Sequence, residues 1–273
     1  MQIELLMERI QLPEEARECA RKVDISEEEY IIYRDCLYHD LRDFLGKWKK
    51  KPDKLEWALK FYLLLSCETY DKYQKSEFAD EVFDQTFYDI TIWCEECFRK
   101  YGIYGLEEVW WLAQSVEMKL FRLGRLQFEP MVLEEDLLGK EECIKAGTEV
   151  LNVHIPAKEP LKMEECLKSF QKAETFFGRK KQIYVCDSWL LSPRLKEILP
   201  EESNIIQFQN LFEVVKVHER FPQAEQRVFQ EVKEDKSLYP EQTTLQKNLK
   251  AYLLEGKQPG IGIGFIKNIY KYI

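Results

Sequence analysis

The chain has 273 residues, of which 45% are hydrophobic and 33% charged, and its 40 basic and 49 acidic residues give a formal net charge of −9. This length predicts one large or two medium domains with an ample hydrophobic core. A general polyanion binder needs a surplus of Lys and Arg, so the composition argues against nucleic acid as a partner.

Neither a targeting segment nor a membrane partner is expected. The start of the chain lacks the basic and apolar regions of a signal peptide. Its longest apolar run, Phe61–Leu65, is far shorter than the ~18 residues that span a bilayer. The eight cysteines are scattered through helical and strand patterns, which is typical of reduced thiols in a cytoplasmic protein.

The first 118 residues are predicted to be helical throughout. Apolar residues at helical spacing begin at Ile3, and Pro13 occupies the favoured first position of a second helix. Ser26 and Glu29 form a capping box that predicts a long helix up to Trp48. Further helices are expected near residues 53–73, 78–100 and 106–118. Residues 1–118 therefore read as a first domain, a compact helical bundle.

The pattern changes at about residue 119, where a second domain, residues 119–273, is expected to begin. Residues 119–129 alternate and contain Gly124 in mid-pattern, which predicts a strand with a bulge or a close backbone approach. The acidic stretch 131–147 suggests a second strand and a connection.

Residues 148–191 predict a strand, a loop, a helix and a second strand. Thr148–Ile155 alternates, and Pro156 ends the ladder because it has no N–H to donate. Met163–Phe177 carries a helical stripe, Gly178 ends it, and Gln182–Cys186 is the second strand. Such strands should run parallel with a right-handed connection, so their ends face the start of the helix, where ligands bind in open sheets.

The remaining chain is predicted to alternate between helices and strands. A helix starts at Ser192-Pro193, a strand covers 205–217, helices cover 222–232 and 243–254, and the tail 260–265 is flexible or extended. The fold class is therefore α+β: an all-helical N-terminal domain followed by an α/β domain with a mixed sheet of about five or more strands.

Several local motifs resemble a bacterial family of acyltransferase-domain proteins. They are FRLGRLQF at 121–128, LNVHIP at 151–156, SWLLSP at 188–193 and SNI at 203–205. The likeness runs over nearly the whole chain. In that family an all-helical N-terminal domain precedes a domain similar to the GNAT N-acetyltransferases. The resemblance implies transfer from acetyl-CoA or another acyl-CoA to the amine of a small-molecule or peptide acceptor, with no metal or redox cofactor.

The resemblance also implies a place for coenzyme A. In the GNAT fold the strands on either side of the main helix separate, and the pantetheine arm bonds to backbone groups of the earlier strand, here at Val153 and Ile155. The loop before the helix binds the pyrophosphate. The superfamily's loop resembles Arg/Gln-x-x-Gly-x-Gly/Ala, whereas 157–162 contains no glycine. Lys158 and Lys162 are expected to supply charge instead, although Glu159 opposes it.

Amine acylation needs a base for the ammonium proton and a donor for the departing thiolate. His154, at the end of the first strand, is the candidate base, and Glu129 is an alternative; the competing readings are a structural histidine and a solvated carboxylate. Tyr184 is the candidate donor or, alternatively, a core residue. Asp187 and Ser188 either orient the substrate or cap the following turn.

Two functions remain open at this point. The first is a small-molecule N-acyltransferase whose helical domain covers or shapes the acceptor site. The second is a catalytically inactive relative that binds a ligand or partner without turnover, which the missing glycines favour. Cys94 and Cys97 have metal-ligand spacing, but they lie in a helical pattern without a second pair at suitable distance, so no metal site is expected.

Overall fold

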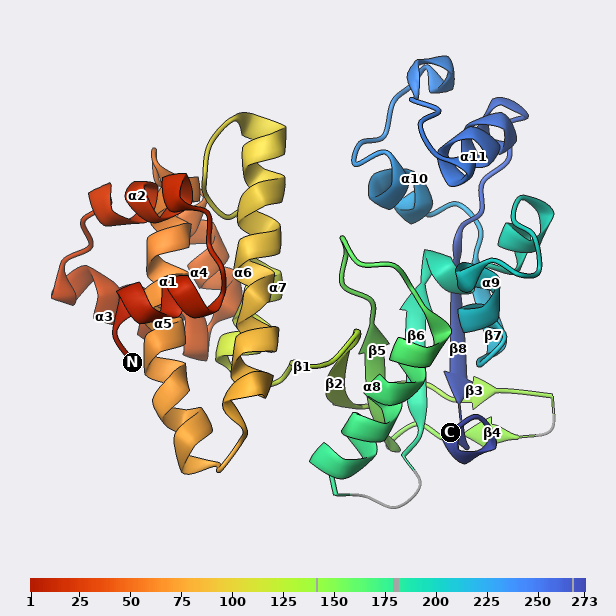
Figure 1. Ribbon diagram of the computed structural model, residues 1–273, viewed down its shortest axis with the longest axis horizontal. Coiled ribbons are helices and arrows are strands. Elements are labelled where there is room, and N and C mark those ends of the chain that lie inside the picture. The colour runs from red at the N-terminus through yellow and green to blue at the C-terminus, as the bar shows by residue number, and fades with distance from the viewer. Residues whose placement is uncertain (141, 179–181, 267) are drawn as a thin grey trace. The chain divides into compact units, whose positions relative to one another are not determined.

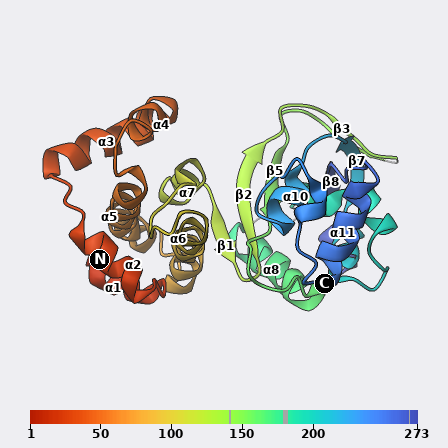
Figure 2. The same cartoon turned by 90° about the horizontal axis from the view of Figure 1, so that it is seen from above.

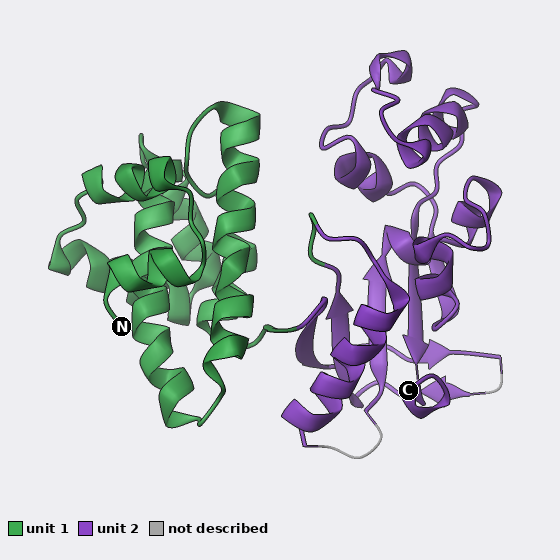
Figure 3. Cartoon of the chain, in the orientation of Figure 1, with its two compact units in different colours: residues 1–123, 156–158 green, residues 124–155, 159–273 purple. Residues whose placement is uncertain are grey.

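The protein is described from a computed structural model that covers residues 1–140, 142–178, 182–266 and 268–273. The chain forms two compact units (Figure 3). Unit 1 comprises residues 1–123 and 156–158, and unit 2 comprises residues 124–155 and 159–273. The sequence places a domain boundary between residues 118 and 119, and the division between the units falls after Leu123.

Unit 1 is a bundle of helices followed by one short strand (Figure 1), in agreement with the predicted helical domain. Its two longest helices, α5 and α6, have 22 residues each, and α5 buries large side chains such as Trp57, Phe61 and Tyr62. The elements are α1 (Ile3–Arg9), α2 (Glu14–Lys22), α3 (Glu27–His39), α4 (Leu41–Trp48), α5 (Lys54–Lys75), α6 (Asp80–Tyr101), α7 (Val109–Val116) and β1 (Phe121–Leu123).

The Ser26 half of the predicted capping box is present, but the long helix predicted after it is wrong. The Glu29 carboxylate accepts hydrogen bonds from Lys51 and Trp57. The Ser26 side chain accepts a hydrogen bond from the Glu29 N–H, 3.1 Å away, and caps α3. The helix then ends at His39, because Asp40 adopts a φ of −149°. Its side chain accepts from the Asp43 N–H at 2.9 Å and starts α4 as a new helix. Aspartate is more favourable at a helix N-cap than in a helix interior. This preference explains why Asp40 starts a new helix instead of continuing α3.

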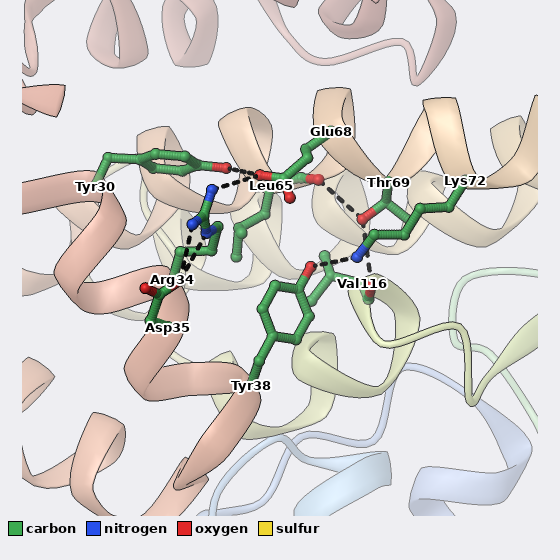
Figure 4. Close-up of polar contacts among 9 residues, drawn as sticks. All are labelled: Tyr30, Arg34, Asp35, Tyr38, Leu65, Glu68, Thr69, Lys72 and Val116. Atoms are coloured by element: carbon green, nitrogen blue, oxygen red, sulfur yellow. Dashed lines mark hydrogen bonds and ion pairs between the residues drawn. The ribbon is translucent and has the colours of Figure 1, made fainter.

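Polar contacts join α3 and α5 along one side of unit 1 (Figure 4). Tyr30 donates to the Glu68 carboxylate at 2.8 Å, and Lys72 donates to the Tyr38 hydroxyl at 3.2 Å. The Thr69 hydroxyl lies within hydrogen-bond distance of the last carbonyl of α7, 3.3 Å away. These contacts fix the register of the helices beside the aromatic core.

Unit 2 contains a mixed sheet with strand order β2-β5-β6-β8-β7, which confirms the predicted mixed sheet of five or more strands. The β5–β6 pair is parallel, as predicted, and the β2–β5, β6–β8 and β7–β8 pairs are antiparallel. The strands are β2 (Leu126–Val132), β3 (Leu137–Leu138), β4 (Cys143–Ile144), β5 (Glu149–His154), β6 (Tyr184–Ser188), β7 (Glu213–His218) and β8 (Ile261–Ile266). The helices are α8 (Met163–Phe176), α9 (Asn204–Gln209), α10 (Gln223–Val228) and α11 (Thr244–Leu254), with short 3₁₀ turns at Trp189–Leu191, Pro193–Glu197, Lys236–Leu238 and Ile269–Lys271.

One face of this sheet is covered by α8 (Figures 1 and 2). Phe170 of α8 packs against Tyr184 of β6 with ring centroids 4.7 Å apart, and against Phe128 of β2 at 5.8 Å. Gly178 has a φ of +60° just after the helix, where the sequence predicted its end. Burying three aromatic rings at the sheet–helix contact supplies much of the apolar stabilisation there.

The opposite face is only partly covered. The two-stranded hairpin β3–β4 packs Leu137 and Ile144 against Val150, Val185 and Phe265 of the sheet. Side chains on one face of a strand recur every second residue. On this same face, β5 carries polar residues beyond Val150, and β6 carries a polar residue beyond Val185.

Gly124 lies in a turn between β1 and β2. Of the two structures predicted for it, the bulge within one strand is therefore wrong. Its φ is +81°, and a Cβ there would lie 3.0 Å from the Ser169 hydroxyl oxygen. That oxygen accepts a hydrogen bond from the Arg125 N–H at 2.8 Å. The predicted close backbone approach is therefore present, and it is an approach to α8.

The long strand predicted at 205–217 is wrong. Its first part is the helix α9, which the Ser203 side chain caps by accepting from the Ile206 N–H at 3.2 Å. Only Glu213–His218 is a strand. The second strand of the strand–helix–strand unit is also shifted, from the predicted 182–186 to Tyr184–Ser188, so Asp187 and Ser188 lie on it. The helix predicted from Ser192-Pro193 is a 3₁₀ turn that ends at Glu197.

The glycine-rich tail is an inner strand of the sheet. β8 lies between β6 and β7. The tail is therefore extended, which is one of the two forms predicted for it, and not flexible. A Cβ on Gly262 would meet the Leu191 carbonyl group, whose carbon lies only 2.6 Å away. Glycine is needed here for space, because another backbone segment crosses the strand.

We expect Gly262→Ala to lower the free energy of unfolding by about 2 kcal/mol, because backbone must move to admit the new methyl group. Gly46→Ala is the matched control: it lies within α4, and no atom lies within 4 Å of the point where its methyl group would be. That change should stabilise the protein by up to about 1 kcal/mol through helix propensity. Urea unfolding measures both; equal effects in the two variants would contradict the steric account of β8.

Candidate functional site

The parallel strands β5 and β6 separate partway along their length. Within the described residues their ladder consists of the pairs Leu151–Tyr184 and Asn152–Val185. Both strands continue beyond it, to His154 and Ser188. On its other side β5 stays paired with β2 as far as His154. The separation that the resemblance to the GNAT fold implied is therefore present: among the described residues the β5–β6 ladder has no pair beyond Asn152.

A histidine–carboxylate pair lies at this point of separation. His154 Nε2 is 2.9 Å from Glu129 Oε2, and Asn152 Nδ2 donates to the same oxygen at 3.0 Å. The side chains of His154 and Glu129 are 24% and 27% exposed, so solvent and substrate can reach them. A neutral imidazole that donates from Nε2 to a carboxylate has Nδ1 as its basic nitrogen. Asn152 Nδ2 also lies 3.2 Å from His154 Nε2, so the three side chains form one polar cluster in which the proton positions on the imidazole depend on its tautomer.

Asp187 continues this polar face on β6. It is two residues beyond Val185, as His154 is two residues beyond Asn152, so both lie on the face not covered by α8. Burial raises the pKa of the Asp187 carboxyl, while the charges of His218 and His154 act in the opposite direction. Both histidines are therefore within electrostatic reach of this carboxylate.

Asp187 also lines an open cleft of about 660 Å³ in unit 2. The other walls are Ile261 of β8, Val217 and His218 of β7, and residues 219–221 directly after β7. A cleft of this size, with a few converging polar groups, suits a small organic ligand. The placement favours the substrate-orienting interpretation of Asp187 over the capping one.

Tyr184 and Ser188 have contacts that favour structural roles. Tyr184 is fully buried, and its hydroxyl donates to Glu174 of α8 at 2.6 Å. Burial, and then the Glu174 carboxylate, raise the pKa of the Tyr184 hydroxyl, which places this side chain in the core under α8. The Ser188 hydroxyl accepts from the Leu190 N–H at 3.2 Å and caps the first 3₁₀ turn. Neither geometry favours a role in catalysis.

The residues expected to bind coenzyme A lie in different surroundings. Val153 is buried on β5, and Ile155 follows directly after that strand. Lys158 belongs to unit 1, where its ammonium group forms ion pairs with the carboxylates of Glu95 and Glu96 on α6. Lys162 is exposed at the N-cap of α8, which has no side-chain cap.

The loop before α8 is fixed by an arginine that the sequence analysis did not assign to it. The Arg125 guanidinium donates to the carbonyls of Glu159, at 2.8 Å, and Pro160, at 3.1 Å. These two carbonyls therefore face a cation and are not placed to meet a phosphate. The loop that lacks the glycines is therefore held by hydrogen bonds from Arg125.

The two cysteines of the CxxC spacing lie on α6. Cys94 and Cys97 are buried, and burial raises the pKa of the Cys97 thiol to about 11 and that of Cys94 further. Among the described residues, no group of three or more His, Cys, Asp or Glu side chains is arranged to bind a metal ion. All eight cysteines are free thiols, as the sequence predicted.

The sequence analysis missed His218, Arg220 and Phe221 as cleft residues. His218 is one of only three histidines in the chain and ends β7. The small number of histidines was the one signal in the sequence that could have pointed to His218. Across the part of the chain that the structure covers, none of the helices has the length and apolar character of a membrane span.

The fold has solved relatives. The chain is similar to the structure of an acyltransferase in complex with decanoyl-CoA, with a TM-score of 0.77 and 23% identity over 97% of this chain and 86% of that one. It is similar to an acyltransferase in complex with decanoyl-CoA and teicoplanin, with a TM-score of 0.76, 23% identity and coverage of 97% and 87%. A mutant acyltransferase in complex with octanoyl-CoA gives a TM-score of 0.76 at 22% identity with the same coverage. No curated protein matches the chain.

Two family models match the sequence, one after the other. Residues 1–118 match the N-acyltransferase N-terminal domain, and residues 120–266 match the GNAT-like C-terminal domain. Together they cover nearly all of the chain, and they agree with the helical bundle and the mixed sheet described above. The chain belongs to the family in which an N-acyltransferase N-terminal domain is followed by a GNAT-like C-terminal domain.

Proposed function

We propose that this protein transfers an acyl group from an acyl-CoA to the amine of a small-molecule or peptide acceptor. The observation that carries the proposal is the separation of β5 from β6 directly beside the His154–Glu129 pair. A thioester arm lying along β5 where that strand has separated from β6 would bring its carbonyl next to His154. Family membership and the acyl-CoA complexes of the similar structures support the same chemistry.

The fit to acyl-CoA is good for the pantetheine arm and weaker for the pyrophosphate. Backbone groups from Val153 to Ile155 can bond to the amides of the arm as an added strand would. The first turn of α8 has no side-chain cap, so its N–H groups suit an anion, but Glu164 and Glu165 in that turn oppose one. Lys162 at the N-cap is the cation best placed to offset them.

The reaction assigned to the site is direct transfer. His154 Nδ1 accepts a proton from the acceptor's ammonium group, and the resulting amine attacks the thioester carbon. A C–N bond forms and the C–S bond breaks; the CoA thiolate takes up the second proton that the nitrogen loses on becoming an amide, and the imidazolium releases the first to solvent. Glu129 stabilises the charged imidazole through the 2.9 Å contact.

Acyl-CoA should stabilise the protein against heat. At a ligand concentration of about 100 times the dissociation constant, the expected gain is about 2.7 kcal/mol of unfolding free energy. A thermal-shift titration with acetyl-, octanoyl- and decanoyl-CoA measures it, and ATP serves as the control for a nonspecific anion. A melting temperature that stays flat with all three acyl-CoAs would remove the basis of the enzyme proposal.

A second candidate is a member of the family that binds a ligand without turnover. The loop geometry favours it, because Lys158 is paired with Glu95 and the carbonyls of Glu159 and Pro160 face Arg125. The two candidates differ in one measurement. Stabilisation by acyl-CoA without any release of free CoA in the presence of a broad panel of amines would favour the second.

A further inference from the structure

The cleft beside Asp187 has walls of opposite charge. Asp187, from β6, places a carboxylate on one wall. Arg220, which follows the end of β7, places a guanidinium on another, and its side chain is exposed. Ile261 and Phe221 give the lining an apolar component between these charges, and Phe221 is 48% exposed.

The second carboxylate of the cleft is already neutralised. Glu219 forms an ion pair with Arg194 at 2.5 Å, and Arg194 also donates to the Gln258 carbonyl. The charges left to meet a ligand are therefore mainly those of Asp187 and Arg220, with His218 beside them. A ligand with only a cationic group would satisfy Asp187 and leave Arg220 facing it without a partner, and a purely anionic ligand would do the reverse.

We propose that the cleft binds an acceptor that carries both an amine and a carboxylate, as a free amino acid does, with the ammonium group at Asp187 and the carboxylate at Arg220. This assignment rests on the proposed function. Asp187 lies on the same sheet face as His154, at the ends of the two separating strands. On this assignment the amine lies on the sheet face that carries the base, which is itself not a lining residue of the cleft, while Arg220 holds the far end of the acceptor.

The chemistry of transfer then follows from this orientation. The ammonium loses one proton to His154, its nitrogen attacks the acyl carbonyl carbon, and the thiolate leaves with the electron pair of the C–S bond and takes up the second proton that the nitrogen loses. The product is an N-acyl amino acid, which has lost the positive charge. It therefore no longer pairs with Asp187, so the same contact that selects the substrate favours release of the product.

The test compares matched ligands. L-phenylalanine, L-leucine and L-lysine are paired with their decarboxylated amines (phenethylamine, isoamylamine and cadaverine), and 3-phenylpropionate lacks the amine. Calorimetric binding is measured without acyl-CoA, and N-acyl product is measured by mass with octanoyl-CoA. At least one amino acid should bind about tenfold or more tightly than its decarboxylated amine, since a charge-assisted contact is lost.

Two cleft variants assign the charges. Arg220→Gln should weaken amino-acid binding about tenfold and leave binding of the decarboxylated amines unchanged. Asp187→Asn should weaken binding of the amino acids and the amines but not of 3-phenylpropionate. Lys247→Gln, which removes an exposed cation of α11, is the control and should change none of these affinities.

The outcomes separate this inference from the proposed function. Equal binding of amino acids and decarboxylated amines, no binding by any of the amino acids, or an equal effect of Arg220→Gln on both classes, overturns the zwitterion assignment. If the binding pattern appears but no N-acyl product forms with any acceptor, the transferase proposal fails and the binding site stands. If simple amines are acylated without preference, the transferase stands and this assignment fails.

Discussion

Replacing His154 with alanine should reduce acyl transfer by about a hundredfold or more, because removing a general base typically costs two to four powers of ten. Glu129 Oε2 lies 2.9 Å from the imidazole Nε2, at the point where β5 and β6 separate, and in the proposed reaction it orients the imidazole. The loss should appear in kcat. Acyl-CoA binding along the β5 backbone does not need the imidazole, so thermal stabilisation by acyl-CoA should persist.

His39→Ala is the matched control, because His39 is exposed at the end of α3 and far from this pair in sequence. Its turnover should equal that of the unmodified protein. Glu129→Gln should also be slower, and the double variant should be no slower than His154→Ala, since the two side chains act as a unit. Turnover that survives in His154→Ala would make the histidine structural and remove the base from the proposed reaction.

The strand–helix–strand unit around α8 was predictable because its signals are local. Thr148–Ile155 and Met163–Phe177 show the two periodicities clearly, and Pro156 and Gly178 mark their ends. The helix that formed at Asn204–Gln209 was not predictable by the same means. Its apolar residues suit a strand as well as a helix, and the Ser203 cap, a weak signal in sequence, decided between them.

The place of β8 in the sheet depends on tertiary packing. From the sequence, the tail with Gly262 and Gly264 could be flexible or extended, since glycine weakens an isolated strand. In the fold these glycines leave room for Leu191 and for the Glu213 carbonyl to cross closely, and this contact places the strand between β6 and β7. No local pattern carries that information.

The position of His154 at a strand end was predictable from the sequence, but its contacts were not. The alternation of residues 148–155 predicts the strand that His154 ends, and the resemblance to the GNAT fold implied the gap beside it. Glu129 meets it only because the antiparallel register pairs Glu129 with Asn152, which puts His154 at the diagonal position two residues on. His218 and Arg220 reach the cleft through β7, whose position beside β8 the sequence did not predict.

The second large effect is expected in the helical part of unit 2 that contains α10 and α11. Glu225 of α10 is completely buried, and its Oε2 accepts from the Tyr239 hydroxyl and from the Lys236 ammonium, each at 2.6 Å. Gln258 donates to the other carboxylate oxygen. These contacts join segments on either side of an apolar cluster that includes Tyr239 and Leu249.

Glu225→Ala should therefore lower the free energy of unfolding by about 3 kcal/mol, because it leaves a cation and two other donors without their buried partner.

Burial acts to raise the pKa of Glu225, but Lys236, Tyr239 and Gln258 hold it below its usual value. A carboxylate with a lowered folded-state pKa stabilises the fold above its unfolded pKa, and this contribution is lost as the pH falls through the folded value. Urea unfolding of the two proteins at pH 7 and at successively lower pH should show the difference between them shrinking below about pH 4. Glu234→Ala, at an exposed position of the same segment, should change stability by less than about 0.5 kcal/mol at every pH. A difference for Glu225→Ala that stays constant down to acid pH would mean that packing, and not the buried charge, accounts for the loss.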